Sequence, residues 1–169
     1  MPRKAKLGLA VQSIAVDPST VGEFVTAIGS IAVYLDEIRQ FRAKSLGISG
    51  PQFAMLTTIR GLDEGDGISV RHVAKAIHVD SSFITTQSKI LEKKGLLRRQ
   101  TDETDARVVN LSLTDKAYKQ IAGLAADEQS LNEFIFADLS RDAFEGVTAQ
   151  LTGLKARLEK ACLKIAGGF

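Results

Sequence analysis

The chain has 169 residues, of which 44% are hydrophobic and 25% are charged, and this composition indicates an ordinary globular protein rather than a disordered one. Residues 5–16 are mildly apolar, but the stretch is too short for a membrane span and lacks the flanks of a secretory signal. The single cysteine, Cys162, excludes an internal disulfide, and we expect a buried, inert thiol. These features predict a cytoplasmic protein with no membrane partner.

The net charge of +2 is small, but it is unevenly distributed. Residues 71–107 contain eight Lys or Arg and five Asp or Glu, a net charge of +3, so the rest of the chain sums to −1. This basic region is a candidate for contact with nucleic acid. The N-terminal residues Arg3, Lys4 and Lys6 fit either a DNA-contacting arm or a solvated tail.

The first half of the chain predicts helices with clear start signals. Asp17-Pro18 begins a long amphipathic helix that ends near Leu46-Gly47, since apolar residues recur at helical spacing along it. Ser49 and Gln52 form a capping-box pattern for a second helix, which ends at about Leu62 before the glycine-rich stretch Gly61–Gly67.

Two further helices follow with a very short connection. Ser69 caps a helix that runs to about Ile77, and Asp80 caps another that ends at Lys93-Lys94-Gly95. Only His78 and Val79 separate them, which is the spacing of a helix-turn-helix. We expect a positive φ at His78, because histidine tolerates that conformation better than branched residues do.

The pattern then changes from helical to alternating. Leu97–Thr101 and Arg107–Leu113 predict two strands, and the polar residues 102–106 between them predict a hairpin tip. A helix-turn-helix followed by such a ribbon is a winged helix. A fifth helix is expected from Thr114-Asp115 to about Leu139, and Ser140 caps a sixth. The fold class is therefore mainly α with a small β-ribbon wing.

The last helix carries an apolar seam. Its members alternate spacings of three and four residues, as in a coiled coil, and they are Phe144, Val147, Leu151, Leu154, Leu158, Ala161 and Ile165. The seam either packs on its own domain or pairs with a second copy, and we favour a homodimer. This gives an N-terminal arm and dimerisation helix (1–47), a winged helix-turn-helix (48–113) and C-terminal dimerisation helices (114–169).

From about Ser49 to Tyr118 the chain resembles the multiple-antibiotic-resistance regulator (MarR) family. The resemblance is carried by sequence blocks that include Gln52–Leu56, Val73–Ile77, Val79–Thr85, Leu91–Arg99, Asp102–Arg107 and Leu111–Thr114. It implies a transcription regulator, usually a repressor, that binds a pseudo-palindromic DNA operator as a homodimer. Two departures are Ala106, where the family often has a second wing arginine, and Phe83, where a polar residue is usual.

The resemblance and the geometry of helix-turn-helix proteins nominate DNA-binding residues. In such proteins the second helix enters the major groove. The candidates are Ser82, Phe83, Thr85, Thr86, Gln87 and Lys89 on that helix and Arg98, Arg99, Asp105 and Arg107 on the wing. Gln87 can bond adenine at two atoms. Phe83 either contacts a thymine methyl or leans on its own domain, and Asp105 is expected to pair with Arg107, the candidate minor-groove arginine.

The resemblance also implies a small-molecule effector: an aromatic acid, a phenol or an acyl coenzyme A thioester. Candidate ligand-binding residues are Tyr34, Ile38, Phe41, Arg42 and Phe53, each of which fits the core equally well. No cofactor or metal is implied, since His72 and His78 do not share a helix face and no nucleophile motif is present. The alternatives are a protein-interaction module and a constitutive DNA-binding protein; an enzyme has no supporting site.

Overall fold

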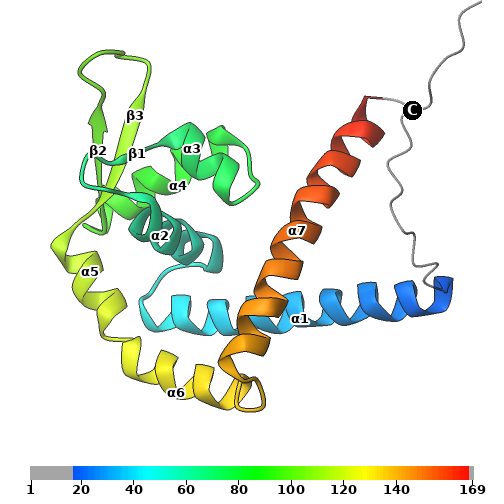
Figure 1. The fold of residues 1–169 in the computed structure, drawn as a ribbon. Coiled ribbons are helices and arrows are strands. Elements are labelled where there is room, and N and C mark those ends of the chain that lie inside the picture. The colour runs from blue at the N-terminus through cyan, green and yellow to red at the C-terminus, as the bar shows by residue number, and fades with distance from the viewer. Residues whose placement is uncertain (1–16, 168–169) are drawn as a thin grey trace, which may run out of the picture. The chain divides into compact units, whose positions relative to one another are not determined.

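A computed structural model describes residues 17–167 of the chain. Seven helices and three strands follow one another in these residues in the order α1, α2, β1, α3, α4, β2, β3, α5, α6 and α7 (Figure 1). They form two compact units, the first ending at Gln120 and the second beginning at Ile121. Arg3, Lys4 and Lys6 lie outside the described residues.

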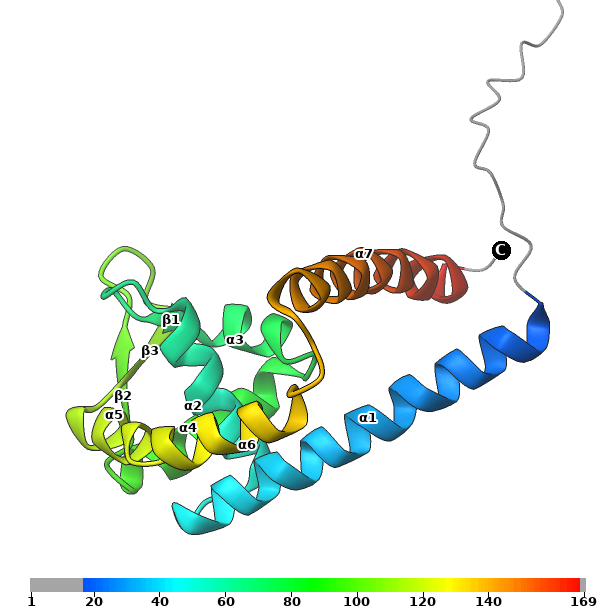
Figure 2. The same cartoon turned by 60° about the horizontal axis from the view of Figure 1, so that its bottom comes forward.

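The first helix, α1, is one uninterrupted element of 28 residues, Pro18–Ser45 (Figure 2). It begins at the predicted cap, where the Asp17 carboxylate accepts the backbone N–H of Ser19 at 3.2 Å. Ala43 is its only buried residue. The C-terminal end of α1 therefore packs within the first unit, and its remaining length keeps large apolar side chains exposed.

The second helix, α2, spans Gly50–Leu62 and begins with the predicted capping box. The Ser49 hydroxyl accepts the backbone N–H of Gln52 at 3.4 Å, and the Gln52 side-chain oxygen Oε1 accepts the backbone N–H of Ser49 at 3.1 Å. The start of α2 lies close to α1, because a Cβ added at Gly50 would be 3.2 Å from Cγ of Gln40.

The helix-turn-helix consists of α3, Val70–Ala76, and α4, Ser81–Lys93. Both begin at their predicted caps, Ser69 and Asp80. His78, in the turn, has φ 56°, so the sequence prediction of a positive φ is confirmed. This left-handed residue lets α4 begin in a new direction after a connection of only four residues.

The sheet has three antiparallel strands in the order β1-β3-β2, one more than the sequence predicted. β2 (Leu97–Thr101) and β3 (Val109–Leu113) form the hairpin, and β1 (Ile68–Ser69) pairs with the free edge of β3. Two residues are too few to show strand periodicity, so β1 had no sequence signal. Gly67 precedes it with φ 80°, and a Cβ there would approach the Leu111 carbonyl oxygen to 3.3 Å.

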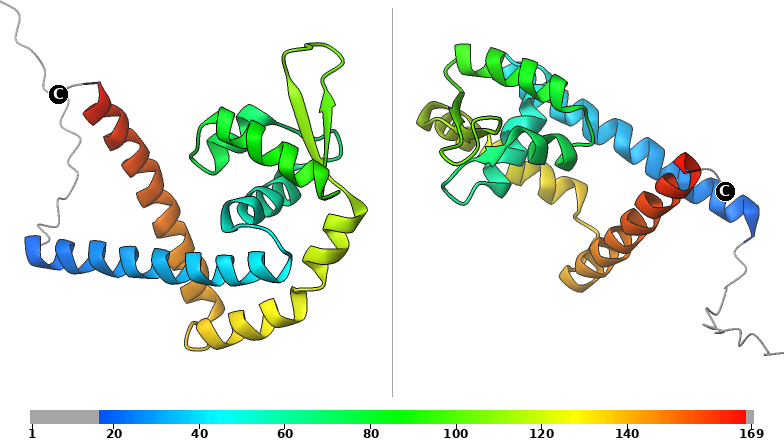
Figure 3. Two further views of the ribbon diagram at one scale, coloured as in Figure 1. Left: turned by 180° about the vertical axis from the view of Figure 1, so that it is seen from behind. Right: turned by 90° about the horizontal axis from the view of Figure 1, so that it is seen from above.

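The core of the first unit lies where α2, α3 and α4 meet the sheet. Its largest fully buried side chains are Met55, Leu56, Ile59, Val73, Ile84, Leu91 and Leu111. The hairpin of β2 and β3 projects past α4, as the rear view in Figure 3 shows. The core thus supports two projections, the outer face of α4 and the hairpin tip.

The prediction of one helix from Thr114 to Leu139 is wrong. The segment forms two helices, α5 (Asp115–Ala122) and α6 (Ala125–Ile135). Gly123 lies at the break. Glycine destabilises a helix interior, because it loses more backbone conformational entropy on folding than any other residue. Beyond the break the backbone N–H of Leu124 bonds the carbonyl of Ile121 at 3.1 Å, a tighter i→i−3 turn.

The last helix, α7, spans Arg141–Ala166 and is capped by Ser140 as predicted. Neither α6 nor α7 contains a buried residue. Cys162 is exposed in the single chain, so the prediction of a buried thiol is wrong there, because no side chain among residues 17–167 covers it. None of the described helices is both long and apolar enough to cross a membrane.

Candidate nucleic-acid interface

The two ends of α4 are capped in different ways. At the N-terminus the Asp80 carboxylate accepts the backbone N–H of Ser82 at 2.8 Å, and the hydrogen bonds from this residue lower the pKa of Asp80. At the C-terminus Gly95 has φ 69°, and the Leu96 N–H bonds the Leu91 carbonyl at 2.9 Å. The two caps therefore fix where the helix begins and ends, and its first turn is exposed to solvent.

The inner face of α4 packs against the core. Ile84, Ser88 and Leu91 each have 0% exposure. Just beyond the helix, Lys94 Nζ donates to the carbonyl oxygen of Gly47 at 2.9 Å. The helix is thereby attached to the loop between α1 and α2, as well as to the core.

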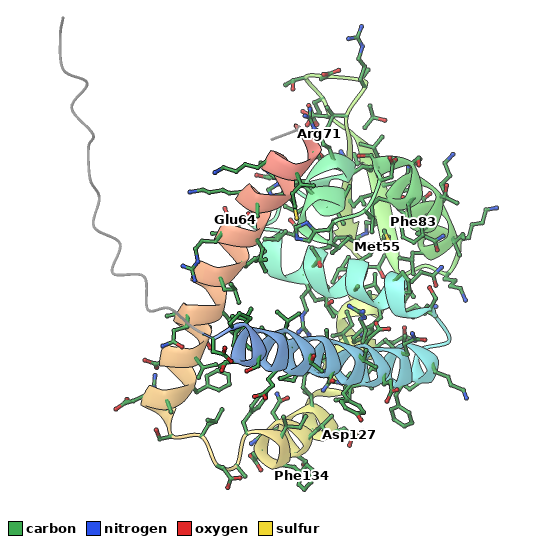
Figure 4. All side chains as sticks on the ribbon, turned by 90° about the vertical axis from the view of Figure 1, so that its right-hand side faces the viewer. Met55, Glu64, Arg71, Phe83, Asp127 and Phe134 are labelled. Carbon is green, nitrogen blue, oxygen red and sulfur yellow. The ribbon has the colours of Figure 1, made fainter. Side chains whose placement is uncertain are left out.

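The outer face of α4 carries the six candidates for reading DNA. Figure 4 labels Phe83 on this helix. Three of the six are exposed, namely Ser82, Thr86 and Lys89. The other three, Phe83, Thr85 and Gln87, are half-buried. The hydroxyls of Thr85 and Thr86 donate to the carbonyls of Ser81 and Ser82, at 2.9 and 3.0 Å. Their oxygens keep lone pairs and can accept from base edges or bound water.

The tip of the hairpin is organised by Asp102. Its carboxylate accepts the N–H and hydroxyl of Thr104 at 2.9 and 2.6 Å, the N–H of Asp105 at 3.2 Å, and Nδ2 of Asn110 at 3.0 Å. These hydrogen bonds, those from Thr104 above all, lower the pKa of Asp102 to about 2. One ionised side chain thus closes the loop that carries the wing arginine.

Arg107 is exposed at the end of this tip, and β3 begins two residues after it rather than at Arg107 as predicted. The Asp105 carboxylate accepts its backbone N–H at 2.9 Å. Among the described residues no ion pair joins Asp105 to the guanidinium. The expected carboxylate–guanidinium pair is therefore replaced by a bond that orients the backbone and leaves the Arg107 side chain available.

Arg98 and Arg99 point to opposite sides of β2, because successive residues of a strand alternate. Arg98 is exposed. The Arg99 side chain is 13% exposed, donates to the Ser88 hydroxyl, and lies 3.7 Å from the Glu92 carboxylate. Arg99 therefore connects the wing to the inner face of α4.

This arrangement matches known proteins in sequence and in fold. The family model described as "MarR family" matches residues 48–109. The HTH-type transcriptional regulator PecS of Dickeya dadantii is 31% identical over 113 residues, 67% of this chain and 66% of that regulator. A MarR protein structure from Peptoclostridium difficile has a TM-score of 0.70 at 23% identity, covering 96% of this chain and 99% of that one.

The chain belongs to the MarR family. Members of this family are transcription regulators and not enzymes. A crystal structure of a MepR–DNA complex from Staphylococcus aureus has the same fold, with a TM-score of 0.66 at 20% identity, and covers 78% of this chain and 94% of that one. The winged helix predicted from the sequence is therefore confirmed as a MarR-type winged helix.

In this MarR-family chain a cavity of about 730 Å³ opens between the end of α1 and the start of α2. Its lining includes Glu37, Gln40, Phe41, Lys44, Gly47, Ile48, Ser49, Gly50 and Pro51. Of the five candidate ligand-binding residues, only Phe41 belongs to this set. Tyr34 is exposed, Ile38 and Arg42 are half-buried, and Phe53 is a core residue.

Sequence reasoning missed most of the cavity because polar side chains and glycines are interspersed with the apolar groups that line it. Glu37, Gln40, Phe41 and Lys44 share one face of α1 at spacings of three and four residues, and that pattern was visible. The sequence prediction rested on the apolar stripe of the same helix instead. No group of metal-binding side chains occurs in residues 17–167.

The predicted seam of α7 is exposed along its length in the single chain. Phe144, Val147 and Leu151 are 44–45% exposed, whereas Leu158 and Ile165 are 56% and 66% exposed. Leu154 is half-buried. A soluble monomer rarely leaves such a continuous apolar surface uncovered.

Proposed function

We propose that this chain binds double-stranded DNA, with α4 in the major groove and the wing tip in the adjacent minor groove. One observation carries the proposal. The exposed face of α4 and the available Arg107 belong to one unit, in which Arg99 attaches the wing to α4. Such a domain holds the exposed face of α4 and the wing arginine at a constant separation, as recognition of adjacent grooves requires.

Some of the candidate residues would contact DNA directly, and others would position the groups that do. Ser82, Thr86 and Lys89 would meet base edges and phosphates from the first turns of α4. Arg107 would enter the minor groove, whose negative potential is strongest where the groove is narrow. Arg98 would neutralise a phosphate beside the wing. Arg99 and Asp105 have partners within the chain and would act by positioning other groups.

We further propose that the regulator is a homodimer that binds a pseudo-palindromic operator as a repressor. The exposed apolar faces of α1 and α7 support association of two copies. A two-fold dimer places two copies of α4 in successive major grooves, so the half-sites should be centred about one helical turn, roughly 10 base pairs, apart.

The cavity between α1 and α2 is our proposed effector site, which would take a small aromatic acid, a phenol or an acyl thioester. Phe41 offers an aromatic face and Lys44 a positive charge. The cavity wall includes Gly47, whose carbonyl accepts from Lys94 at the end of α4. A ligand that prefers one position of this wall would shift α4, because only differential binding moves an equilibrium.

Selection of bound duplexes from a random library, followed by fluorescence anisotropy at several salt concentrations, tests the DNA proposal. Arg107→Ala should weaken binding to the selected site by about 1–3 kcal/mol. Arg157→Ala removes one positive charge from α7 and is the matched control, for which we expect little change. A salt-independent affinity, or equal effects of the two variants, would contradict the proposed interface.

The effector is tested by mass spectrometry of small molecules that co-purify with the protein, and then by their effect on DNA affinity. A true effector should weaken operator binding by roughly 5- to 150-fold, and DNA should weaken its binding by the same factor. Lys44→Ala should reduce that coupling for an acid. Equal affinity for the free and the DNA-bound protein excludes a compound as effector, and DNA binding that no compound alters indicates a constitutive DNA-binding protein.

A further inference from the structure

Three groups form a hydrogen-bonded chain from the start of α2 to the recognition helix. The backbone N–H of Ser49 donates to the Gln52 side-chain oxygen at 3.1 Å. The Gln52 side-chain nitrogen then donates to the Gln87 side-chain oxygen at 2.9 Å. Gln52 is 7% exposed, and both ends of its amide are engaged.

The backbone N–H determines the direction of the whole chain. An N–H group can only donate, so the oxygen of the Gln52 amide must face Ser49. The nitrogen of that amide then faces Gln87, whose acceptor oxygen must point back at it. The orientation of both amides follows from this one donor and needs no choice between similar atoms.

This orientation limits what Gln87 can offer to DNA. A glutamine that recognises adenine uses its oxygen as acceptor and its nitrogen as donor at the same time. In Gln87 the oxygen is directed at Gln52, which takes one of its two lone pairs, whereas both N–H groups stay free to donate to a base, so the amide faces DNA chiefly as a donor. Guanine presents two acceptors in the major groove, O6 and N7, and suits such a donor best.

We propose that Gln52 is a positioning residue for sequence specificity, which makes Gln87 a hydrogen-bond donor that selects guanine rather than adenine. The inference rests on the proposed role of α4 in reading DNA and revises the sequence expectation for Gln87. Gln52 itself stays behind the helix and touches no base.

Gln52→Glu gives the sharpest test. A glutamate at this position still accepts the Ser49 N–H, because glutamate serves as well as glutamine in a capping box. It has no N–H to give Gln87, so the Gln87 amide turns, donates inward and presents its oxygen to the DNA. Gln52→Met removes both bonds and frees the amide, while Gln87→Ala identifies the base pair that Gln87 reads.

We expect selection from a random duplex library to give guanine at that base pair for the wild-type protein. Gln52→Glu should change the preference there to a base that donates, cytosine or adenine, by at least about tenfold relative to guanine. Preferences at other base pairs should stay the same. A merely structural role of Gln52 would lower stability and weaken all sites together, without changing which base is preferred.

A second measurement needs no DNA. In the free protein, NMR should show slow exchange with water of the Gln52 side-chain NH₂ and fast exchange of the Gln87 side-chain NH₂. Sequence-selective binding that none of the variants redirects overturns the role of Gln52 alone, as does fast exchange of both amides. Absence of duplex binding by the wild type contradicts the proposed function itself.

Discussion

Adjacent arginines on β2 have different partners, although the sequence presents them as a pair. Arg99 reaches across to α4, where its guanidinium bonds the fully buried Ser88 hydroxyl and neighbours Glu92. Arg98 extends into solvent on the other side of the strand. Alternation along the strand thus assigns one arginine to the architecture and leaves the other for a partner.

The two arginines should separate stability from DNA affinity. Arg99→Ala removes a charged hydrogen bond and should lower the free energy of unfolding by about 1–3 kcal/mol. Arg98→Ala should change stability by less than about 0.5 kcal/mol, but should lower the salt dependence of DNA binding by about one ion. Urea denaturation and anisotropy titrations measure the two effects. Equal stability of both variants would show that Arg99 does not brace the wing.

At the scale of elements, the tip of the wing is held in its conformation by one carboxylate, that of Asp102. Asp102 accepts hydrogen bonds from both the backbone and side chains of the tip, and they favour its ionised form. Its pKa is depressed below the ordinary 3.8, so its contribution to wing stability is present above that pH and is lost as the pH falls toward about 2. Acid should therefore loosen the wing tip within this window.

NMR titration can test this in the free protein. The backbone amide shifts of Thr104 and Asp105 should change with a midpoint near pH 2, because both N–H groups donate to Asp102. Asp102→Asn should abolish the step, whereas Glu103→Gln, a change of the neighbouring exposed acid, should leave it in place. A midpoint near 4 would mean that the network does not form in solution.

Across the whole molecule, the elements that begin or end at a helix cap or a turn residue were predictable from the sequence. Caps at Asp17, Ser49, Asp80 and Ser140 and the turn at His78 lie where the sequence placed them, since each signal is local. The break at Gly123 was missed because apolar spacing continues through it. The division of the chain at 47/48 and 113/114 remains a prediction.

The site was less predictable than the fold, because the sequence gives residue types and not their partners. Nothing local shows that Arg99 bends inward while Arg98 does not, or that Gln87 is held by Gln52, 35 residues away. Four of the five effector candidates lie outside the cavity for a related reason. Apart from Arg42 they were chosen as apolar or aromatic residues, but the cavity is formed by a mixed face of α1 and the loop before α2.

The remaining prediction concerns the apolar seam of α7, whose large side chains other than Leu154 are 44–66% exposed in one chain. Leu158 is 56% exposed in one chain, so covering it twice in a symmetric dimer contributes each time roughly half of the 1.5–3 kcal/mol of a fully exposed leucine. An aspartate there would also bury an unpaired charge. Leu158→Asp should therefore raise the dimer dissociation constant by roughly 100-fold or more, as measured by sedimentation equilibrium. Ala156→Asp places the same charge on the other side of the helix and should leave the dimer intact. Circular dichroism should show unchanged helix content for both variants, so that loss of the dimer is distinguished from unfolding. A wild-type monomer at micromolar concentration, or equal behaviour of the two variants, would exclude this seam from the interface.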